Sequence, residues 1–161
     1  MTTQTSLVST PTNGSKPSYS IAIVTVGSRG DVQPYILLGK ALINAGHKVI
    51  LCTEERLKPL VEEFGLMYGH LDGDSTGLLY EKDAQAALRS GSFMKLIKLT
   101  QAWEKKFDKN KILQSYDTGI PKDCDIIVSS ALTMTQTMCI AQARKIRWIS
   151  LVLGKFIEIK K

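Results

Sequence analysis

Short apolar runs alternate with longer segments of helical periodicity along most of the chain. The first run, residues 20–26, is rich in β-branched residues and nearly uninterrupted, as in a parallel strand buried on both faces. Apolar residues at helical spacing follow from position 35. The same alternation predicts further strands at 48–52, 66–71, 125–128 and 147–152 and helices at 56–64 and 133–145. We therefore expect an α/β fold, a Rossmann-like parallel sheet with flanking helices.

The turn after the first run is the most informative stretch of the chain. It contains Gly27, Ser28, Arg29, Gly30 and Asp31. Pro34 then fits the first turn of a helix, where a missing N–H costs little. In open α/β sheets, ligands bind outside the carboxyl ends of the strands and face the N–H groups of the following helix. The turn is therefore a candidate ligand site.

Asp31 has two interpretations. As a helix N-cap it would accept a backbone hydrogen bond, mainly from Gln33, because Pro34 has no N–H. As a general base, its carboxylate would accept the proton of an attacking hydroxyl while the new bond forms. One carboxylate can perform both roles, so the residues alone leave both open.

Three segments carry a specific motif: Gly-Ser-Arg-Gly-Asp-Val-Gln-Pro-Tyr at 27–35, Leu-Gly-Lys-Ala-Leu at 38–42 and Ala-Gly-His-Lys-Val at 45–49. Weaker similarity continues through 64–66 and 71–74, and through 125–128 to Trp148. In these segments the chain closely resembles the amino-terminal domain of family 28 glycosyltransferases, nearest to the UDP-glucose:sterol 3-β-glucosyltransferases. The resemblance implies the amino-terminal half of a GT-B glycosyltransferase.

The same resemblance implies a function and a role for each residue of the turn. Asp31 would be the catalytic base that activates the acceptor hydroxyl, and Gly27, Ser28, Arg29 and Gly30 would shape the substrate pocket. The chain would be the acceptor-binding half of an inverting hexosyltransferase that moves a sugar from a UDP donor to a sterol or other lipid hydroxyl. The alternative is a non-catalytic lipid-binding or partner subunit that has lost the donor domain.

Members of the family bind the nucleotide sugar on a second, carboxyl-terminal domain, through a glycine- and histidine-rich segment that this sequence lacks. We expect a disordered tail at 1–18, rich in Thr, Ser and Pro, and an acceptor-side domain at 19–161. Neither of these two expected segments corresponds to the carboxyl-terminal donor domain. We therefore expect no cofactor on this chain and the UDP-sugar on the missing domain, which a partner chain could supply.

Four further polar residues follow predicted strands at the same edge of the sheet: Asp72, Asp74, Ser129 and Ser130. They could bind sugar or acceptor hydroxyls, although the two aspartates also fit a simple turn. No further acidic or histidine ligand is spaced to complete a metal site, so no metal is expected. His47 lies at the opposite edge, and His70 lies inside the third strand, where we expect a packed or hydrogen-bonded core residue.

Residues 92–115 predict a single basic amphipathic helix, with apolar residues at helical spacing and lysines at most polar positions. A helix packed on the sheet with a solvated lysine face fits this pattern, and so does attraction to an anionic membrane surface. The candidate membrane-surface residues are Lys95, Lys98, Trp103, Lys105 and Lys106.

The 161 residues carry a formal net charge of +6, and a positively charged protein can bind nucleic acid. Aromatic stacking motifs, zinc spacing and a helix-turn-helix pattern are absent, so no nucleic-acid partner is expected. No apolar stretch is long enough to span a bilayer and no signal peptide is recognisable. We expect a cytoplasmic protein. If the basic helix binds a membrane surface, the protein would be peripheral on that membrane. Cys52, Cys124 and Cys139 are expected to be buried free thiols.

Overall fold

The computed structural model describes residues 17–152, apart from the side chain of Glu104. The predictions for residues 1–16 and 153–161 lie outside the described residues. Five parallel strands form one sheet in the order β3-β2-β1-β4-β5. Their bounds are β1 Ser20–Val24, β2 Lys48–Glu54, β3 Met67–Leu71, β4 Ile126–Ser129 and β5 Arg147–Ser150. The predicted parallel α/β sheet is confirmed.

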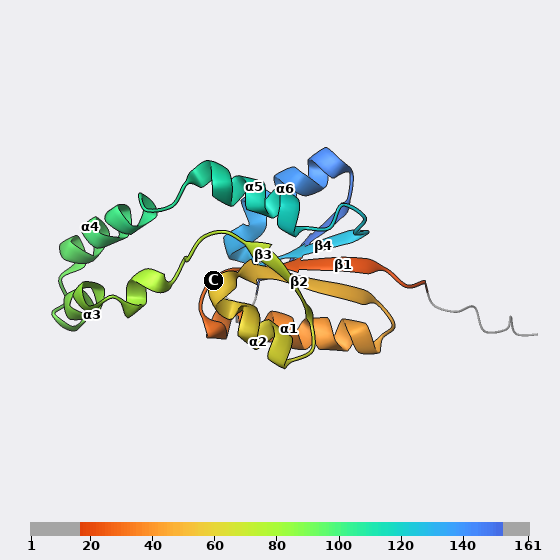
Figure 1. Ribbon diagram of the computed structural model, residues 1–161, viewed down its shortest axis with the longest axis horizontal. Coiled ribbons are helices and arrows are strands. Elements are labelled where there is room, and N and C mark those ends of the chain that lie inside the picture. The colour runs from red at the N-terminus through yellow and green to blue at the C-terminus, as the bar shows by residue number, and fades with distance from the viewer. Residues whose placement is uncertain (1–16, 153–161) are drawn as a thin grey trace, which may run out of the picture.

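Helices cover both faces of this sheet (Figure 1). The α-helices within the described residues are α1 Arg29–Asn44, α2 Lys58–Glu63, α3 Lys82–Arg89, α4 Phe93–Glu104, α5 Lys109–Gly119 and α6 Met134–Arg144. Short 3₁₀ turns are η1 Glu55–Leu57, η2 Gly77–Tyr80 and η3 Ala131–Thr133. The pair α1 and α2 lies on one face, and the pair α5 and α6 lies on the other.

The central strand β1 explains how the three layers pack together. Its side chains alternate between the two faces, so Ile21 and Ile23 belong to the core under α1 and α2. Ala22 and Val24 belong to the second core, under α5 and α6. All four residues are buried, as the uninterrupted apolar run predicts. Because all the strand pairs are parallel, the carboxyl ends of the strands lie at one edge of the sheet, called here the carboxyl edge.

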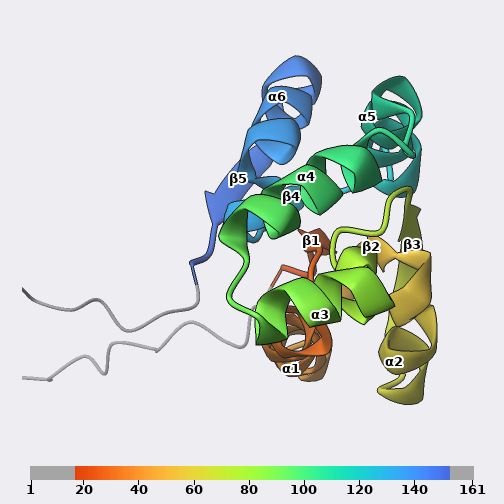
Figure 2. The same cartoon turned by 90° about the vertical axis from the view of Figure 1, so that its left-hand side faces the viewer.

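Helices α3 and α4 form an arm that extends beyond the carboxyl edge (Figure 1, Figure 2). The prediction of one helix over 92–115 is wrong, because α4 ends at Glu104 and α5 begins at Lys109. Asp108 breaks the pattern by capping α5, and its carboxylate accepts a hydrogen bond from the Asn110 N–H at 2.8 Å. The basic segment therefore folds as two helices.

Two other predictions need correction. His70 is exposed rather than in the core, because β3 is an edge strand of the sheet. Its imidazole is hydrogen-bonded to Tyr68 on the same strand and to Asp72 in the loop that follows. Cys139 is exposed on α6, whereas Cys52 and Cys124 are buried as predicted. His47 lies in the turn before β2, at the amino edge, where the prediction placed it.

Candidate functional site at the carboxyl edge

The turn between β1 and α1 holds Asp31 in a fixed position. Gly27 has a positive φ of 126°, which an L side chain rarely adopts, and a Cβ there would lie 2.7 Å from Asp31 Oδ2. The Asp31 Oδ2 atom accepts hydrogen bonds from the Ser28 N–H at 2.8 Å and from the Ser28 hydroxyl at 2.7 Å. Glycine at position 27 is therefore required by the approach of the carboxylate.

Of the two interpretations of Asp31, the helix N-cap is wrong, and so is the prediction that Pro34 lies in the first helical turn. Helix α1 begins at Arg29, Ser28 is its N-cap with extended backbone angles, and Asp31 is the third helical residue. Ser28 is preferred at this position because its small polar side chain suits the cap, and Asp31 reciprocates as in a capping box. Pro34 lies inside the helix, in its second turn.

Asp31 is exposed to solvent and lines a cavity of about 170 Å³, called here the Asp31 cavity. Gly30, Pro34, Tyr35 and Ser130 also line it. Both hydrogen bonds from Ser28 go to Oδ2, so Oδ1 has no partner among the described residues. Asp31 lies in the first turn of α1. Oδ1 is thus free to accept a proton from a hydroxyl in the cavity.

A second cavity, of about 430 Å³, adjoins the first and is called here the Glu54 cavity. The two cavities share Val26 and Leu132 in their linings. Most of the wall of the Glu54 cavity is apolar or aromatic, and it includes Leu78, Trp103, Phe107, Ile112 and Tyr116. Such walls suit the apolar body of a ligand, because ligand pockets combine apolar surface with a few placed polar groups.

Glu54, the last residue of β2, is the polar group that the sequence analysis missed. It is only 3% exposed, and its carboxylate accepts hydrogen bonds from the Ser75 N–H at 2.6 Å and the Ser75 hydroxyl at 3.1 Å. Burial raises the pKa of Glu54, and the Ser75 hydrogen bonds and Arg56 only partly oppose this. The predicted strand stopped at residue 52, two residues short of Glu54. The sequence signal that could have identified this site residue is a glutamate two positions beyond the predicted strand at 48–52, at the carboxyl edge.

Asp72 and Asp74 both line the Glu54 cavity, as their predicted position implies. Each already has a partner, because Asp72 bonds to His70 Nε2 at 3.1 Å and Asp74 pairs with Arg56 Nε at 3.2 Å. The Asp74 carbonyl also accepts a hydrogen bond from the Trp103 indole N–H at 3.0 Å. The loop after β3 therefore serves as a structured wall that holds Trp103 against the cavity.

The two serines after β4 lie in different environments. Ser130 lines the Asp31 cavity, and its hydroxyl lies 3.2 Å from the hydroxyl of Thr133. Ser129 is fully buried, and its hydroxyl has no partner among residues 17–152. Only Ser130 can contact a ligand without a rearrangement. Arg29, at the first position of α1, is exposed to solvent.

The candidate membrane-surface residues separate into two groups. Lys95, Lys98, Lys105 and Lys106 are exposed. Trp103 is half-buried and faces the Glu54 cavity instead, with the Lys106 ammonium 4.3 Å from the centre of its ring. In the described part of the chain, no helix is long and apolar enough to cross a bilayer.

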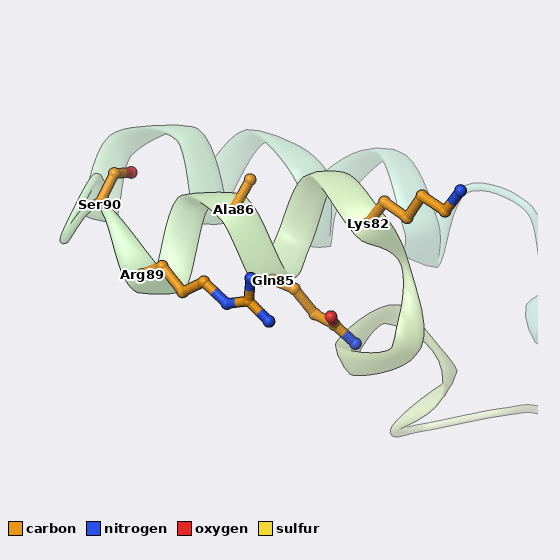
Figure 3. A pocket seen from close by; sticks show the side chains of 5 residues that line it. All are labelled: Lys82, Gln85, Ala86, Arg89 and Ser90. Atoms are coloured by element: carbon orange, nitrogen blue, oxygen red, sulfur yellow. The ribbon is translucent and has the colours of Figure 1, made fainter.

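Two further features carry no site. A hollow of about 510 Å³ lies along α3, and Figure 3 shows that the long side chains of Lys82, Gln85 and Arg89 do not converge on a common point. Within residues 17–152, no group of three or more His, Cys, Asp or Glu side chains could hold a metal ion. The candidate site is therefore the pair of adjoining cavities.

Solved structures of glycosyltransferases share this parallel sheet with flanking helices, and they show that the chain has the fold of a GT-B domain. The calicheamicin glycosyltransferase CalG4 superposes with a TM-score of 0.61 at 15% identity, over 91% of this chain and 35% of that chain. The Streptomyces sp. SF2575 glycosyltransferase SsfS6 superposes with a TM-score of 0.53 at 19% identity, over 83% of this chain and 39% of that chain. These structures show the fold that the two proteins share with this chain.

The sequence identifies the family within that class. The model of the glycosyltransferase family 28 N-terminal domain matches residues 21–143, and the chain belongs to this family. The O-mycaminosyltylonolide 6-deoxyallosyltransferase of Streptomyces fradiae is 36% identical over 119 residues, 73% of this chain and 28% of that protein. The sterol 3-beta-glucosyltransferase of Komagataella phaffii is 32% identical over 120 residues, 74% of this chain and 9% of that protein. The chain thus spans less than a third of either relative.

Proposed function

We propose that this chain is the acceptor-binding half of an inverting hexosyltransferase that moves a sugar from a UDP donor to a sterol or other lipid hydroxyl. The observation that carries the proposal is Asp31, which lines the cavity and whose Oδ2 is held by Ser28 while Oδ1 has no partner among the described residues. Membership of family 28 and the similarity to sterol 3-beta-glucosyltransferases support it. The apolar walls of the adjoining cavity suit a lipid acceptor.

The proposed chemistry is a single displacement. The acceptor oxygen attacks the anomeric carbon of the sugar from the face opposite the UDP leaving group, so the configuration of that carbon inverts. As the new carbon–oxygen bond forms, the hydroxyl proton passes to Asp31 Oδ1, and the electron pair of the broken bond leaves with UDP. Ser28 keeps the carboxylate oriented, because both of its donors bind the other oxygen.

The UDP-sugar belongs, in this proposal, to a second domain or a partner chain. This chain supplies the acceptor side and no resident cofactor. A structure of SsfS6, which shares the fold at 19% identity and a TM-score of 0.52, contains thymidine diphosphate, and a nucleoside diphosphate is the leaving group that the proposal requires. The nucleotide would lie opposite the carboxyl edge, facing Asp31.

The arm of α3 and α4 supports a peripheral membrane association. Phe93 is 72% exposed and Met94 is 67% exposed at the start of α4, with the exposed Lys95 and Lys98 beside them. Apolar side chains flanked by lysines suit the interface of an anionic bilayer. Flotation with vesicles of phosphatidylcholine and phosphatidylserine at low salt tests this. We expect binding that falls when Phe93 and Met94 are both changed to Ser, and no binding of the unchanged chain would overturn it.

The test of the proposed function combines this chain with the nucleotide-sugar-binding domain of the Komagataella phaffii sterol glucosyltransferase, UDP-glucose and ergosterol. We expect a sterol β-glucoside, and a rate that falls about 100-fold or more in Asp31→Asn, which keeps the shape but cannot take the proton. Asp83→Asn is the matched control, because Asp83 is an exposed carboxylate in the first turn of α3.

Glucoside formation that survives Asp31→Asn would overturn the base mechanism. Sterol binding without transfer, in a mixture whose donor domain binds UDP-glucose, would favour a non-catalytic lipid-binding subunit instead. Absence of sterol binding would overturn the acceptor role itself.

A further inference from the structure

We infer that the Glu54 cavity selects acceptors that carry a second hydroxyl, remote from the one that reacts, and that Glu54 and Gln136 recognise this hydroxyl. The inference rests on the proposed function, in which the reacting hydroxyl lies beside Asp31. It narrows the acceptor class from any lipid alcohol to an apolar alcohol with at least one additional hydroxyl.

One ligand can occupy both cavities. Val26, after β1, and Leu132, in η3, line the Asp31 cavity and the Glu54 cavity alike. A molecule with its reacting hydroxyl beside Asp31 can therefore extend past these two side chains into the larger cavity. Its apolar body would pack against the walls formed by Trp103 and Phe107, whose rings meet edge to face with centroids 5.8 Å apart.

Gln136 gives the first reason to expect a polar group on that body. It lies on α6 and lines the Glu54 cavity, and its Oε1 atom is buried with no hydrogen-bond partner in the described structure. A hydrocarbon placed beside this amide would leave it unpaired, which is costly for a buried polar group. A hydroxyl satisfies either orientation of the amide, because it can both donate and accept.

Glu54, at the end of β2, gives the second reason to expect a hydroxyl on the ligand. Both of its carboxylate oxygens are bonded to Ser75, yet each retains capacity for a further hydrogen bond. No lysine or arginine among the described residues pairs with it within 4.0 Å. A buried carboxyl without a cationic partner is better satisfied by a ligand hydroxyl than by hydrocarbon.

The other acidic groups of the cavity do not fit this role as well. Asp72 is bonded to His70 and Asp74 is paired with Arg56, each through Oδ1, and both side chains are partly exposed to solvent. Water can satisfy their remaining oxygen atoms, whereas Glu54 is buried. Lys109 also lines the cavity, but it is exposed to solvent. The inference therefore rests on the two buried groups, the Glu54 carboxyl and the Gln136 Oε1 atom.

The test measures binding apart from transfer. Equilibrium binding of tritiated cholesterol, 7β-hydroxycholesterol and 25-hydroxycholesterol, delivered from cyclodextrin, places the second hydroxyl on the ring system or on the tail. We expect one of the two hydroxysterols to bind about 10-fold more tightly than cholesterol, which is about 1.4 kcal/mol. Gln136→Leu should abolish this preference without weakening cholesterol binding, because it removes the amide and keeps an apolar side chain of similar size.

Two further variants keep the inference falsifiable if Gln136→Leu fails to fold. Glu54→Met should reduce the preference, whereas Glu54→Gln should retain it, because an amide still bonds a hydroxyl. Gln142→Leu, at an exposed position of α6, is the matched control. Equal affinity for all three sterols, or a preference that survives both Gln136→Leu and Glu54→Met, would overturn this inference and leave the proposed function intact. Absence of binding by every sterol would overturn the proposed function as well.

Discussion

The Arg56 guanidinium donates a hydrogen bond through Nη2 to the Gly27 carbonyl, with the two atoms 3.4 Å apart. Through Nε it also bonds to the Asp74 carboxylate, and it contacts the Thr76 hydroxyl. One side chain thus connects the turn that carries Asp31 with the loop that walls the Glu54 cavity. The two cavities are therefore coupled through Arg56, although neither cavity is lined by it.

Arg56→Lys should lower the rate of transfer about 10-fold. A lysine keeps the charge but lacks the planar fork that bonds both loops at once, so the turn holding Asp31 loses its support. The free energy of unfolding should change by less than about 1 kcal/mol, because the Arg56–Asp74 pair is about a third exposed. Steady-state kinetics and urea unfolding measure the two effects. Lys58→Ala is the control, because Lys58 contacts Glu62 and the Tyr68 ring and lines neither cavity. Unchanged kinetics in Arg56→Lys would refute the coupling.

Gly27→Ala should abolish transfer, because the new Cβ would displace the Asp31 carboxylate. It should also cost about 1 to 3 kcal/mol of stability through the left-handed backbone at this position. Gly46→Ala separates the two effects. Gly46 also has a positive φ, but nothing lies within 4 Å of its Cβ position, so this variant should lose stability and keep its activity. If both variants lose activity equally, the contact with Asp31 is not the cause.

The parts of the fold that sequence predicts correctly are those set by local pattern. The buried strand β1 and the turn at Gly27 follow from neighbouring residues, because alternation and backbone freedom act over a few positions. The burial of His70 was predicted wrongly because it depends on strand order, which places β3 at one edge of the sheet. Local pattern holds no information on that order.

Glu54 and Gln136 were missed for a related reason. They lie 82 positions apart, one at the end of β2 and the other on α6, and only the folded domain brings both to one cavity. The break between α4 and α5 was missed because the lysines continue through it and the capping preference of Asp108 competes with the helical spacing.

The stability of the protein should fall as pH rises through the pKa of Glu54. Burial raises this pKa in the folded state, so the folded protein binds the proton more tightly than the unfolded chain does. The stabilising contribution is complete below the ordinary glutamate pKa of about 4.3 and is lost above the raised value. Urea unfolding from pH 4 to pH 8 should therefore show a loss of stability that is missing in Glu54→Gln. Parallel curves for the two proteins would show that Glu54 does not titrate in this window.

The three cysteines report on the packing beneath the cavities. Cys139 is exposed, whereas Cys52 and Cys124 belong to the core under α5 and α6. Burial, and then the nearby Cys124, raise the pKa of Cys52 to about 12, which suppresses the reactive thiolate. Dithiobis(nitrobenzoic acid) should therefore modify one thiol per folded chain rapidly and three after unfolding, and Cys139→Ser should remove the rapid reaction. A second rapid thiol would contradict the packing of this core.

The slow reaction of the other two thiols then measures how often this core opens. Cys52 lies two residues before Glu54 on β2, so a ligand that fills the Glu54 cavity stabilises the closed state by mass action. Saturating hydroxysterol should slow the modification of Cys52 and Cys124 about 10-fold and leave that of Cys139 unchanged. Equal slowing of all three would instead mean that the sterol sequesters the reagent, since Cys139 needs no opening to react.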